Sequence, residues 1–261
     1  MTSIEKIIDV QDVSVWFGDF NAVDHLNFHV DVGERVAILG RTGAGKSTLL
    51  NLLIGNLDPT SGTVRVAGKD PLRERDELQG IVAMAYQSPR LLPWRTAKAN
   101  VEAGLEILGV DKQERSQRAL HWLRKVHLDN AADRYPNQLS GGMRQRTSLA
   151  RAFAIDPKLI FLDESFSALD EVTAKSLRAD FVELCESTSV SSVIVTHSIE
   201  EAFQIADRVL VFGRPARILG EFDAAEERER YRGRLSDLRD HIHQLMVAAE
   251  QADQDGSRHA S

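Results

Sequence analysis

The chain has 261 residues, of which 43% are hydrophobic and 27% are charged, so its composition is that of an ordinary globular protein with a sizeable core. Its formal net charge of −7 at pH 7 argues against a general nucleic-acid-binding protein held by phosphate contacts. The single cysteine, Cys185, excludes an internal disulfide and is expected to be buried, in a reducing compartment. No basic N-terminal region precedes an apolar core, and no apolar run approaches about 18 residues, so we expect a soluble, intracellular protein.

The first third of the chain is predicted to consist mainly of β-strands. Leu26, Phe28 and Val30 alternate with polar residues, which is typical of a strand with one buried face. Residues 62–68 have the length and the flanking glycines of another half-buried strand. Between them, residues 35–40 form a continuous apolar run, the pattern of a strand that is buried on both faces.

The remainder of the chain alternates between predicted helices and predicted buried strands. Residues from about 96 to 154 have apolar positions at helical spacing. Buried strands are then expected at 158–163, 191–197 and 208–213, with a helix between each neighbouring pair. This alternation predicts an α/β fold with a mostly parallel sheet covered by helices, into which a helical segment is inserted.

Residues 223–261 are predicted to form an amphipathic helix and a polar tail. The apolar residues of this segment recur at intervals of three and four positions: Leu235, Leu238, Ile242 and Leu245. From Ala252 onward the chain is polar, and we expect that end to be frayed or disordered. The apolar face is expected to pack on the rest of the same chain, and a regulatory or dimer contact is the alternative.

A glycine-rich loop follows the continuous apolar run. Gly40-x-x-x-x-Gly45-Lys46-Ser47 matches the phosphate-binding P-loop pattern. A helix closed by Gly55 is expected after it. The glycines let consecutive amides point at phosphate oxygens, Lys46 would reach the β- and γ-phosphates, and Ser47 would bind Mg²⁺. The residues expected to surround the phosphates are Gly40, Arg41, Thr42, Gly43, Ala44, Gly45, Lys46, Ser47 and Thr48.

Two carboxylates stand at the end of the predicted strand 158–163. Asp163 lies at its C-terminal end, the edge at which open α/β sheets bind ligands, and would hold Mg²⁺ through its water shell. The next residue, Glu164, would polarise the water that attacks a γ-phosphate. Without the P-loop, Glu164 would be better explained as a solvated loop residue.

A second glycine pair, in LSGGMRQR, also has the features of an anion site. Ser140 can cap the helix that follows. Gly141 and Gly142 allow the N-terminal amides of that helix to approach an anion closely. One chain therefore carries two candidate phosphate sites.

The order of these motifs resembles that of the ATP-binding-cassette (ABC) ATPases. The P-loop is followed by LSGGMRQR, LIFLDE, SALD and a histidine after VIVT, and the resemblance covers roughly residues 5–220. It implies that ATP and Mg²⁺ are bound by an ABC-type P-loop NTPase core over residues 1–222. That core would have an N-terminal antiparallel β subdomain and a helical subdomain inserted at about 90–155.

The resemblance also explains why one chain has two phosphate sites. In the family, two copies pack head to tail, and the Ser140-Gly141-Gly142 segment of one would close over the γ-phosphate bound by the other. Asp170, at the end of SALD, would lie across that interface. The working unit is therefore expected to be a homodimer with two ATP molecules.

Three further residues take roles from their place in the motifs. Gln87 resembles the glutamine that joins the γ-phosphate and Mg²⁺ to the partner subunit, and His197 resembles the histidine that contacts the γ-phosphate. Phe17 falls where an aromatic ring stacks on adenine, with Trp16 as the weaker candidate. Both aromatic residues would equally fit in the core.

One position departs from the family pattern. The glutamate is usually followed by proline, and here Ser165 follows Glu164. Because proline fixes φ, we expect serine to loosen the turn while both carboxylates stay in place. We still expect an active ATPase.

The sequence favours a role in transport. We expect the ATP-hydrolysing subunit of an importer, bound to a separate membrane permease at the cytoplasmic face of a bacterial membrane, with an extracytoplasmic binding protein supplying the solute.

The segment 91–94, Leu-Leu-Pro-Trp, would be a partner surface, or Leu91 and Trp94 would pack internally. The resemblance of LLPWRTAKANV and LSGGMRQR points to the group that imports nitrate, sulfonates, taurine and similar small, often anionic solutes. A soluble ABC ATPase of repair, translation or iron–sulfur assembly is the alternative, and a two-gene exporter is a third interpretation.

Overall fold

The computed structural model describes residues 5–232 and 234–258, and the chain divides into two compact units. The first unit consists of Met1–Leu78 and Val193–Ser261, and the second consists of Gln79–Ser192. The second unit is thus one continuous segment inserted into the first.

The first unit contains an antiparallel sheet and a second, mixed group of strands. The antiparallel sheet has the order β2-β1-β4, from β1 (Lys6–Phe17), β2 (Phe20–Asp31) and β4 (Ser61–Val66). Leu26, Phe28 and Val30 are buried, which confirms the alternation in β2.

The mixed strands have the order β7-β3-β8-β9, from β3 (Arg35–Gly40), β7 (Ser191–Thr196), β8 (Arg208–Phe212) and β9 (Ile218–Asp223). β3 is parallel to β8, and β9 runs antiparallel to β8. The side chains of β3 from Val36 to Leu39 are fully buried, as the continuous apolar run predicts.

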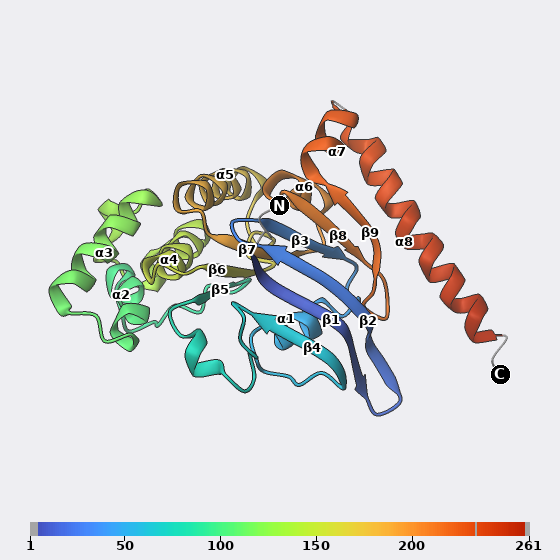
Figure 1. The fold of residues 1–261 in the computed structure, drawn as a ribbon. Coiled ribbons are helices and arrows are strands. Elements are labelled where there is room, and N and C mark those ends of the chain that lie inside the picture. The colour runs from blue at the N-terminus through green and yellow to red at the C-terminus, as the bar shows by residue number, and fades with distance from the viewer. Residues whose placement is uncertain (1–4, 233, 259–261) are drawn as a thin grey trace. The chain divides into compact units, whose positions relative to one another are not determined.

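Helices of the first unit surround these strands. They are α1 (Lys46–Leu53), α6 (Ile199–Ile205), α7 (Ala224–Arg230), α8 (Leu235–Arg258) and the short 3₁₀ helix η1 (Arg75–Leu78). In Figure 1, α8 is the long red helix next to β9.

The apolar face of α8 packs on its own unit. Leu238, Ile242 and Met246 are buried, and the helix contacts β8, β9 and α6. The side chain of Leu235 lies outside the described residues. The backbone stays helical to Arg258, so the expected fraying from Ala252 is wrong for the backbone, because each residue added to an existing helix forms a further backbone hydrogen bond.

The second unit is mainly helical. Its strands are β5 (Val82–Tyr86) and β6 (Leu159–Asp163), which are parallel, and Ser191 at the start of β7 donates its amide to the carbonyl of Lys158. Its helices are α2 (Ala97–Ile107), α3 (Lys112–Lys125), α4 (Gly141–Ala154), α5 (Glu171–Thr188), η2 (Asp129–Ala131) and η3 (Pro136–Gln138).

Helix α4 is the centre of the second unit. It contacts α2, α3, α5 and β5. Phe153 on α4 stacks on Trp122 of α3 and meets Phe181 of α5 edge to face, at ring-centroid distances of 5.2 and 6.2 Å. Aromatic pairs of this kind contribute about 0.5–1.5 kcal/mol beyond their buried area. Cys185 on α5 is buried, as expected for a lone thiol.

Gly55 ends helix α1 in the left-handed region, with φ at 70°. Asn56 donates its amide to the carbonyl of Asn51, and Gly55 donates to Leu52, which together make a Schellman cap. A Cβ atom on Gly55 would lie 1.9 Å from the carbonyl oxygen of Pro71. Both the backbone angle and the space therefore require glycine here.

We predict that Gly55→Ala lowers the free energy of unfolding by more than about 2 kcal/mol, because the left-handed angle costs 1–2 kcal/mol and the clash adds to it. Gly68→Ala is the matched control, since Gly68 has φ at 77° but nothing within 4 Å of an added Cβ. It should lose only the conformational part, about 1 kcal/mol. Urea unfolding curves give both values, and equal losses would contradict the steric argument.

Candidate functional site

The P-loop is built by a buried strand that turns directly into a helix. Gly40 ends β3 opposite Phe212 of β8, and α1 begins at Lys46. Gly43 and Gly45 have φ angles of 84° and 75°, so the backbone between the strand and the helix curls back on itself. The N-terminal amides of α1 and the positive end of its dipole therefore face this loop, which suits an anion.

Gly45 has a second reason to be glycine. A Cβ atom there would lie 2.7 Å from the carbonyl oxygen of Ala22 and 2.6 Å from the Cβ of Ala216. Ala22 belongs to β2, and Ala216 to the connection between β8 and β9. Ala216 donates its amide to Ala22 and accepts a hydrogen bond from the amide of Asp24. The loop is therefore fixed against two other segments of its unit.

The Lys46 side chain lies over the loop rather than in open solvent. It is only 6% exposed, and its Nζ donates to the carbonyl oxygens of Gly40 at 2.6 Å and Arg41 at 3.0 Å. A buried ammonium group favours nearby negative charge. Lys46, the curled amides and the hydroxyl of Ser47, which is exposed at the start of α1, together fit a polyphosphate with a divalent cation.

The aromatic residues of the β1–β2 hairpin are on the surface. Trp16 is 48% exposed and Phe17 is 51% exposed, so the alternative that they are core residues is wrong. Both follow the buried Val15 at the end of β1, where the strand extends beyond the packed part of the sheet. Phe20 is also exposed, and the guanidinium of Arg214 lies 5.7 Å from the centre of its ring. An exposed aromatic hairpin is suited to stacking on a base.

Two further residues predicted for the site, His197 and Arg41, also belong to the first unit. His197 is exposed directly after β7, next to Ser198, which caps α6. Nη2 of Arg41, in the P-loop, lies 3.3 Å from Nδ1 of His243 on α8. The sequence patterns gave no sign of this contact between the C-terminal helix and the loop.

In the second unit, the C-terminal ends of β5 and β6 bring three predicted residues together. Tyr86 pairs with Asp163, so Gln87 and Glu164 follow at neighbouring strand ends. The amide nitrogen of Gln87 donates to Oγ of Ser167 at 3.1 Å. The carboxylates and the glutamine thus belong to one cluster of polar groups at a single sheet edge.

The turn after Asp163 is more restrained than the sequence suggested. Glu164 has φ at 46°, which is uncommon for a residue with a side chain. Ser165 is 2% exposed, and its Oγ donates to the carbonyl oxygen of Ala85 at 2.9 Å. The hydroxyl therefore ties this turn to β5, a restraint that the sequence did not reveal, and a looser turn than with proline stays a prediction.

The second glycine pair begins helix α4. Ser140 is the N-cap residue, and its Oγ accepts a hydrogen bond from the amide of Met143 at 3.2 Å, which confirms the predicted cap. Ser140 and Gly141 are exposed, so the helix N-terminus is accessible. Gly142 has a packing role as well, because a Cβ there would lie 2.6 Å from the methyl group of Thr173 on α5.

Asp170 caps helix α5. Its carboxylate accepts a hydrogen bond from the amide of Thr173 at 3.0 Å. Hydrogen bonds from Thr173 lower the pKa of this carboxyl group below its usual value. Stability from this cap is present above the unfolded pKa and is lost as the pH falls through the folded pKa.

The arginines of α4 bind within the second unit. Arg144 donates to the carbonyl of Leu139, and Arg146 forms an ion pair with Asp180 of α5. Arg151 donates to the carbonyl oxygens of Pro89 and Arg90, at 2.8 and 2.9 Å, and burial lowers its pKa. These side chains hold neighbouring segments of backbone.

Residues 85–96 contain no helix or strand after Tyr86, and side chains satisfy their carbonyl groups. Besides Arg151, Gln145 donates to Tyr86 at 3.1 Å, and Asn100 donates to Leu92, Arg95 and Thr96. Both amide side chains are buried, and a buried polar residue on an apolar helix face was the signal in the sequence. Sequence reasoning missed these residues.

This irregular segment presents an aromatic residue to solvent. Trp94 is 70% exposed, whereas Leu91 and Leu92 are half-buried. Internal packing therefore does not account for Trp94, and the part of the chain that the structure describes offers it little cover.

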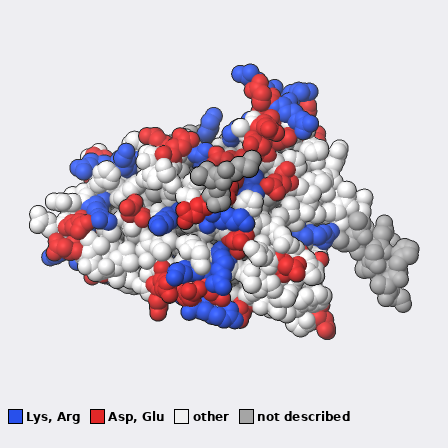
Figure 2. All heavy atoms as spheres, viewed as in Figure 1, with Lys and Arg blue, Asp and Glu red and all other residues white. Residues whose placement is uncertain are grey.

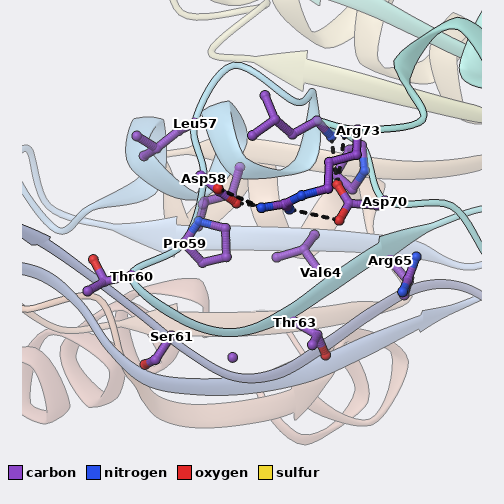
Figure 3. A pocket seen from close by; sticks show the side chains of 14 residues that line it. Leu57, Asp58, Pro59, Thr60, Ser61, Thr63, Val64, Arg65, Asp70 and Arg73 are labelled. Atoms are coloured by element: carbon purple, nitrogen blue, oxygen red, sulfur yellow. Dashed lines mark hydrogen bonds and ion pairs between the residues drawn. The ribbon is translucent and has the colours of Figure 1, made fainter.

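A hollow of about 200 Å³ lies elsewhere in the first unit, between the α1–β4 connection and residues 70–73. Figure 3 shows Arg73 reaching between two carboxylates, Asp58 and Asp70, at 2.8 and 3.0 Å. Hydrogen bonds from the Arg73 amide and side chain contribute to lowering the pKa of Asp70. Arg73 is thus paired with both carboxylates, and its ion pair with Asp58 joins the α1–β4 connection to residues 70–73.

In Figure 2, Lys and Arg side chains lie next to Asp and Glu side chains, and areas without charge separate these clusters. Within the described residues, no helix is both long enough and apolar enough to cross a membrane.

A glycine-rich loop between a buried strand and a helix, within alternating strands and helices, defines a P-loop α/β protein. Residues 23–167 match the family model described as "ABC transporter". The chain belongs to the ABC transporter family.

Individual relatives agree with this assignment. Over 207 residues the chain is 40% identical to the sulfate/thiosulfate import ATP-binding protein CysA of Thermosynechococcus vestitus, covering 79% of this chain and 61% of that protein. Over 201 residues it is 40% identical to the glycine betaine transport ATP-binding protein OpuAA of Bacillus subtilis, covering 74% of this chain and 48% of that protein. The chain thus spans less than two thirds of the length of these curated relatives.

A solved structure confirms the fold class. The dimeric, post-hydrolysis state of the ATP-binding cassette MJ0796, bound to ADP and Pi, superposes with a TM-score of 0.73 at 30% identity, covering 83% of this chain and 98% of that chain. The predicted ABC-type P-loop fold, with its antiparallel β sheet and its helices, is therefore confirmed.

We predict that Arg151→Gln exposes residues 89–95 to protease. Loss of two hydrogen bonds to backbone carbonyls should favour local opening by about 1–2 kcal/mol, which raises tryptic cleavage after Arg90 and Arg95 about five- to thirtyfold. Peptide mapping by mass spectrometry measures these rates. Arg124→Gln, at an exposed arginine of α3, is the matched control. Equal cleavage in both variants would show that Arg151 does not hold this segment.

Proposed function

We propose that this protein is the ATP-binding and ATP-hydrolysing subunit of an ABC importer. The observation that carries the proposal is the P-loop, with Lys46 held over it by two loop carbonyls and glycines at the positions where the backbone turns. The names of the relatives support coupling to transport, since both include transport or import. They do not favour a soluble ABC ATPase of another process.

In this proposal the first unit binds the nucleotide. Phe17 stacks on adenine, residues 40–48 surround the phosphates, and His197 contacts the γ-phosphate. Lys46 neutralises charge on the β- and γ-phosphates, and Ser47 gives its hydroxyl to Mg²⁺. The metal, when bound, neutralises the charge that develops on the phosphate oxygens.

The second unit supplies the groups for hydrolysis. Glu164 accepts a proton from the attacking water, while Asp163 and Gln87 help to hold Mg²⁺. The position of these three residues at one sheet edge supports assigning them to one reaction. The N-terminus of α4, at Ser140, Gly141 and Gly142, together with Asp170, serves the nucleotide of a second copy of the chain.

We further propose that two copies form a homodimer with ATP at the interface. The exposed N-terminus of α4, capped by Ser140, supports this, because it is an anion site at the surface. The related cassette MJ0796 is described as dimeric. ATP bound between two copies would favour the closed dimer by mass action, and hydrolysis would let it open.

The proposed partner is a membrane permease, which places the protein peripherally at the cytoplasmic face of a bacterial membrane. Exposed Trp94 supports a partner surface at 91–94. The solute is proposed to be small and anionic, of the nitrate, sulfonate or taurine kind, delivered by an extracytoplasmic binding protein. The import of sulfate or thiosulfate by one relative, as its name states, supports an anionic solute.

Residues 1–222 would form the ATPase domain, with the helical subdomain inserted at about 90–155. The segment 223–261 would follow this domain, and a regulatory role for it stays a hypothesis.

Phosphate release tests the activity. With Mg-ATP, we expect Glu164→Gln to lower the rate about a hundredfold or more, because the proton acceptor is removed, while ATP binding persists. Lys46→Ala should instead weaken ATP binding. Glu183→Gln, at an exposed glutamate of α5, is the matched control and should leave the rate unchanged. A wild-type rate no higher than that of Glu164→Gln, with the partners present, would exclude the proposed activity.

Affinity purification tests the transport role. Tagged Glu164→Gln protein, which holds ATP, should recover an integral membrane permease from solubilised host membranes. Trp94→Ala in the same background should recover about tenfold less, because a tryptophan that anchors an interface contributes about 2 kcal/mol. Val32→Ala, at another exposed apolar residue, is the control. Recovery of soluble partners alone would contradict the transport role.

A further inference from the structure

The turn from Glu164 to Ser167 holds a charged residue in a backbone conformation that needs support. Glu164 has φ at 46°, and the left-handed region costs a residue with a side chain about 1–2 kcal/mol. Such a conformation persists only where its surroundings fix it. Each of the three residues that follow Glu164 makes a contact outside the turn.

Ser165 points back to the neighbouring strand. Its side chain is 2% exposed, and its hydroxyl donates to the carbonyl oxygen of Ala85 at 2.9 Å. Ala85 is the second-last residue of β5 and pairs with Leu162 of β6, whereas Ser165 lies beyond the end of β6, so this bond adds to the regular pairing of the two strands. Ala85 also lies two residues before Gln87. The hydroxyl therefore links the Glu164 turn to the strand that carries Gln87.

The two residues after Ser165 complete the restraint. Phe166 is 1% exposed, with its ring 6.1 Å from that of Phe181 on α5. Ser167 donates its hydroxyl to the carbonyl of Glu164 at 2.8 Å and accepts a hydrogen bond from Gln87 at 3.1 Å. Of these three side chains, that of Ser165 is the one that donates to the backbone of β5, so its removal tests that restraint.

We propose that Ser165 is a positioning residue, whose hydroxyl fixes the Glu164 carboxylate relative to Gln87 by tying the turn to β5. The proposal rests on the proposed function, in which Glu164 accepts a proton and Gln87 helps to hold Mg²⁺. Ser165 itself touches no reacting atom. Its hydroxyl acts by limiting the conformations of the turn.

Steady-state ATPase kinetics test this role. Ser165→Ala should lower kcat about fivefold, the effect of one hydrogen bond of about 1 kcal/mol, and should raise the Mg²⁺ concentration for half-maximal activity. KM for ATP should stay unchanged, because no group of the P-loop is altered. Ser165→Thr keeps the hydroxyl and should restore both kcat and the Mg²⁺ midpoint. A loss of folded protein alone would lower kcat without moving that midpoint.

Ser148→Ala is the matched control. Ser148 is a fully buried serine of α4, and its Oγ has no hydrogen-bond partner within the described part of the chain. It undergoes the same chemical change in the same unit, without the loss of a hydrogen bond. It should match the wild type in kcat and in Mg²⁺ midpoint.

Amide hydrogen exchange provides a measurement that does not depend on activity. Peptides that cover 164–169 should exchange about fivefold faster in Ser165→Ala than in the wild type, with Ser165→Thr close to the wild type. Wild-type kcat and exchange in Ser165→Ala would overturn the positioning role while leaving the ATPase in place. An inactive wild type would instead refute the proposed function, and the exchange rates would still decide whether the hydroxyl holds the turn.

Discussion

The close approach of three backbone segments at Gly45 is the constraint on which the nucleotide-binding half of the molecule depends. No side chain fits there, because Ala22 and Ala216 already occupy the space that a Cβ would take. The same glycine has the left-handed φ that lets β3 turn into α1. One residue thus satisfies a conformational requirement and a packing requirement together. Since β2 carries the exposed aromatic hairpin, the loop and the hairpin are held in a fixed relation by this contact.

In the second unit, side-chain hydrogen bonds hold a segment of irregular backbone in a defined position. After Tyr86 the chain leaves the sheet, and its carbonyl groups no longer have strand partners. Arg151 and Asn100 supply donors to these carbonyl groups from two helices. Gln145 and Ser165 donate to the last two residues of β5, Tyr86 and Ala85. Buried carbonyl groups need such partners, so these side chains determine the path of the segment. Trp94 lies in the segment that these hydrogen bonds hold, and Asp163 and Glu164 lie at the start of the turn that Ser165 ties to β5.

Local patterns in the sequence were enough for much of the architecture. The apolar run at 35–40 predicted β3, the glycines around Lys46 predicted the loop, and Ser140 was recognised as a helix cap, because each depends on residues close in sequence. The bond from Ser165 to Ala85 spans eighty positions, and no local pattern reveals it. The exposure of Trp94 was also undecided, because a tryptophan beside two leucines fits a core and a surface equally well.

The insertion of the second unit has a consequence for the order in which the protein is made. β3 lies beside β8, with Val36 opposite Arg208, so the strand that leads into the P-loop lacks this parallel neighbour until the C-terminal part of the chain has been synthesised. Gln79–Ser192, by contrast, is continuous and is complete before β8 emerges. Domains fold as units during synthesis, and distant strand pairs form late. On the ribosome, the unit with the proposed hydrolytic residues is therefore assembled first, and the P-loop reaches its final surroundings last.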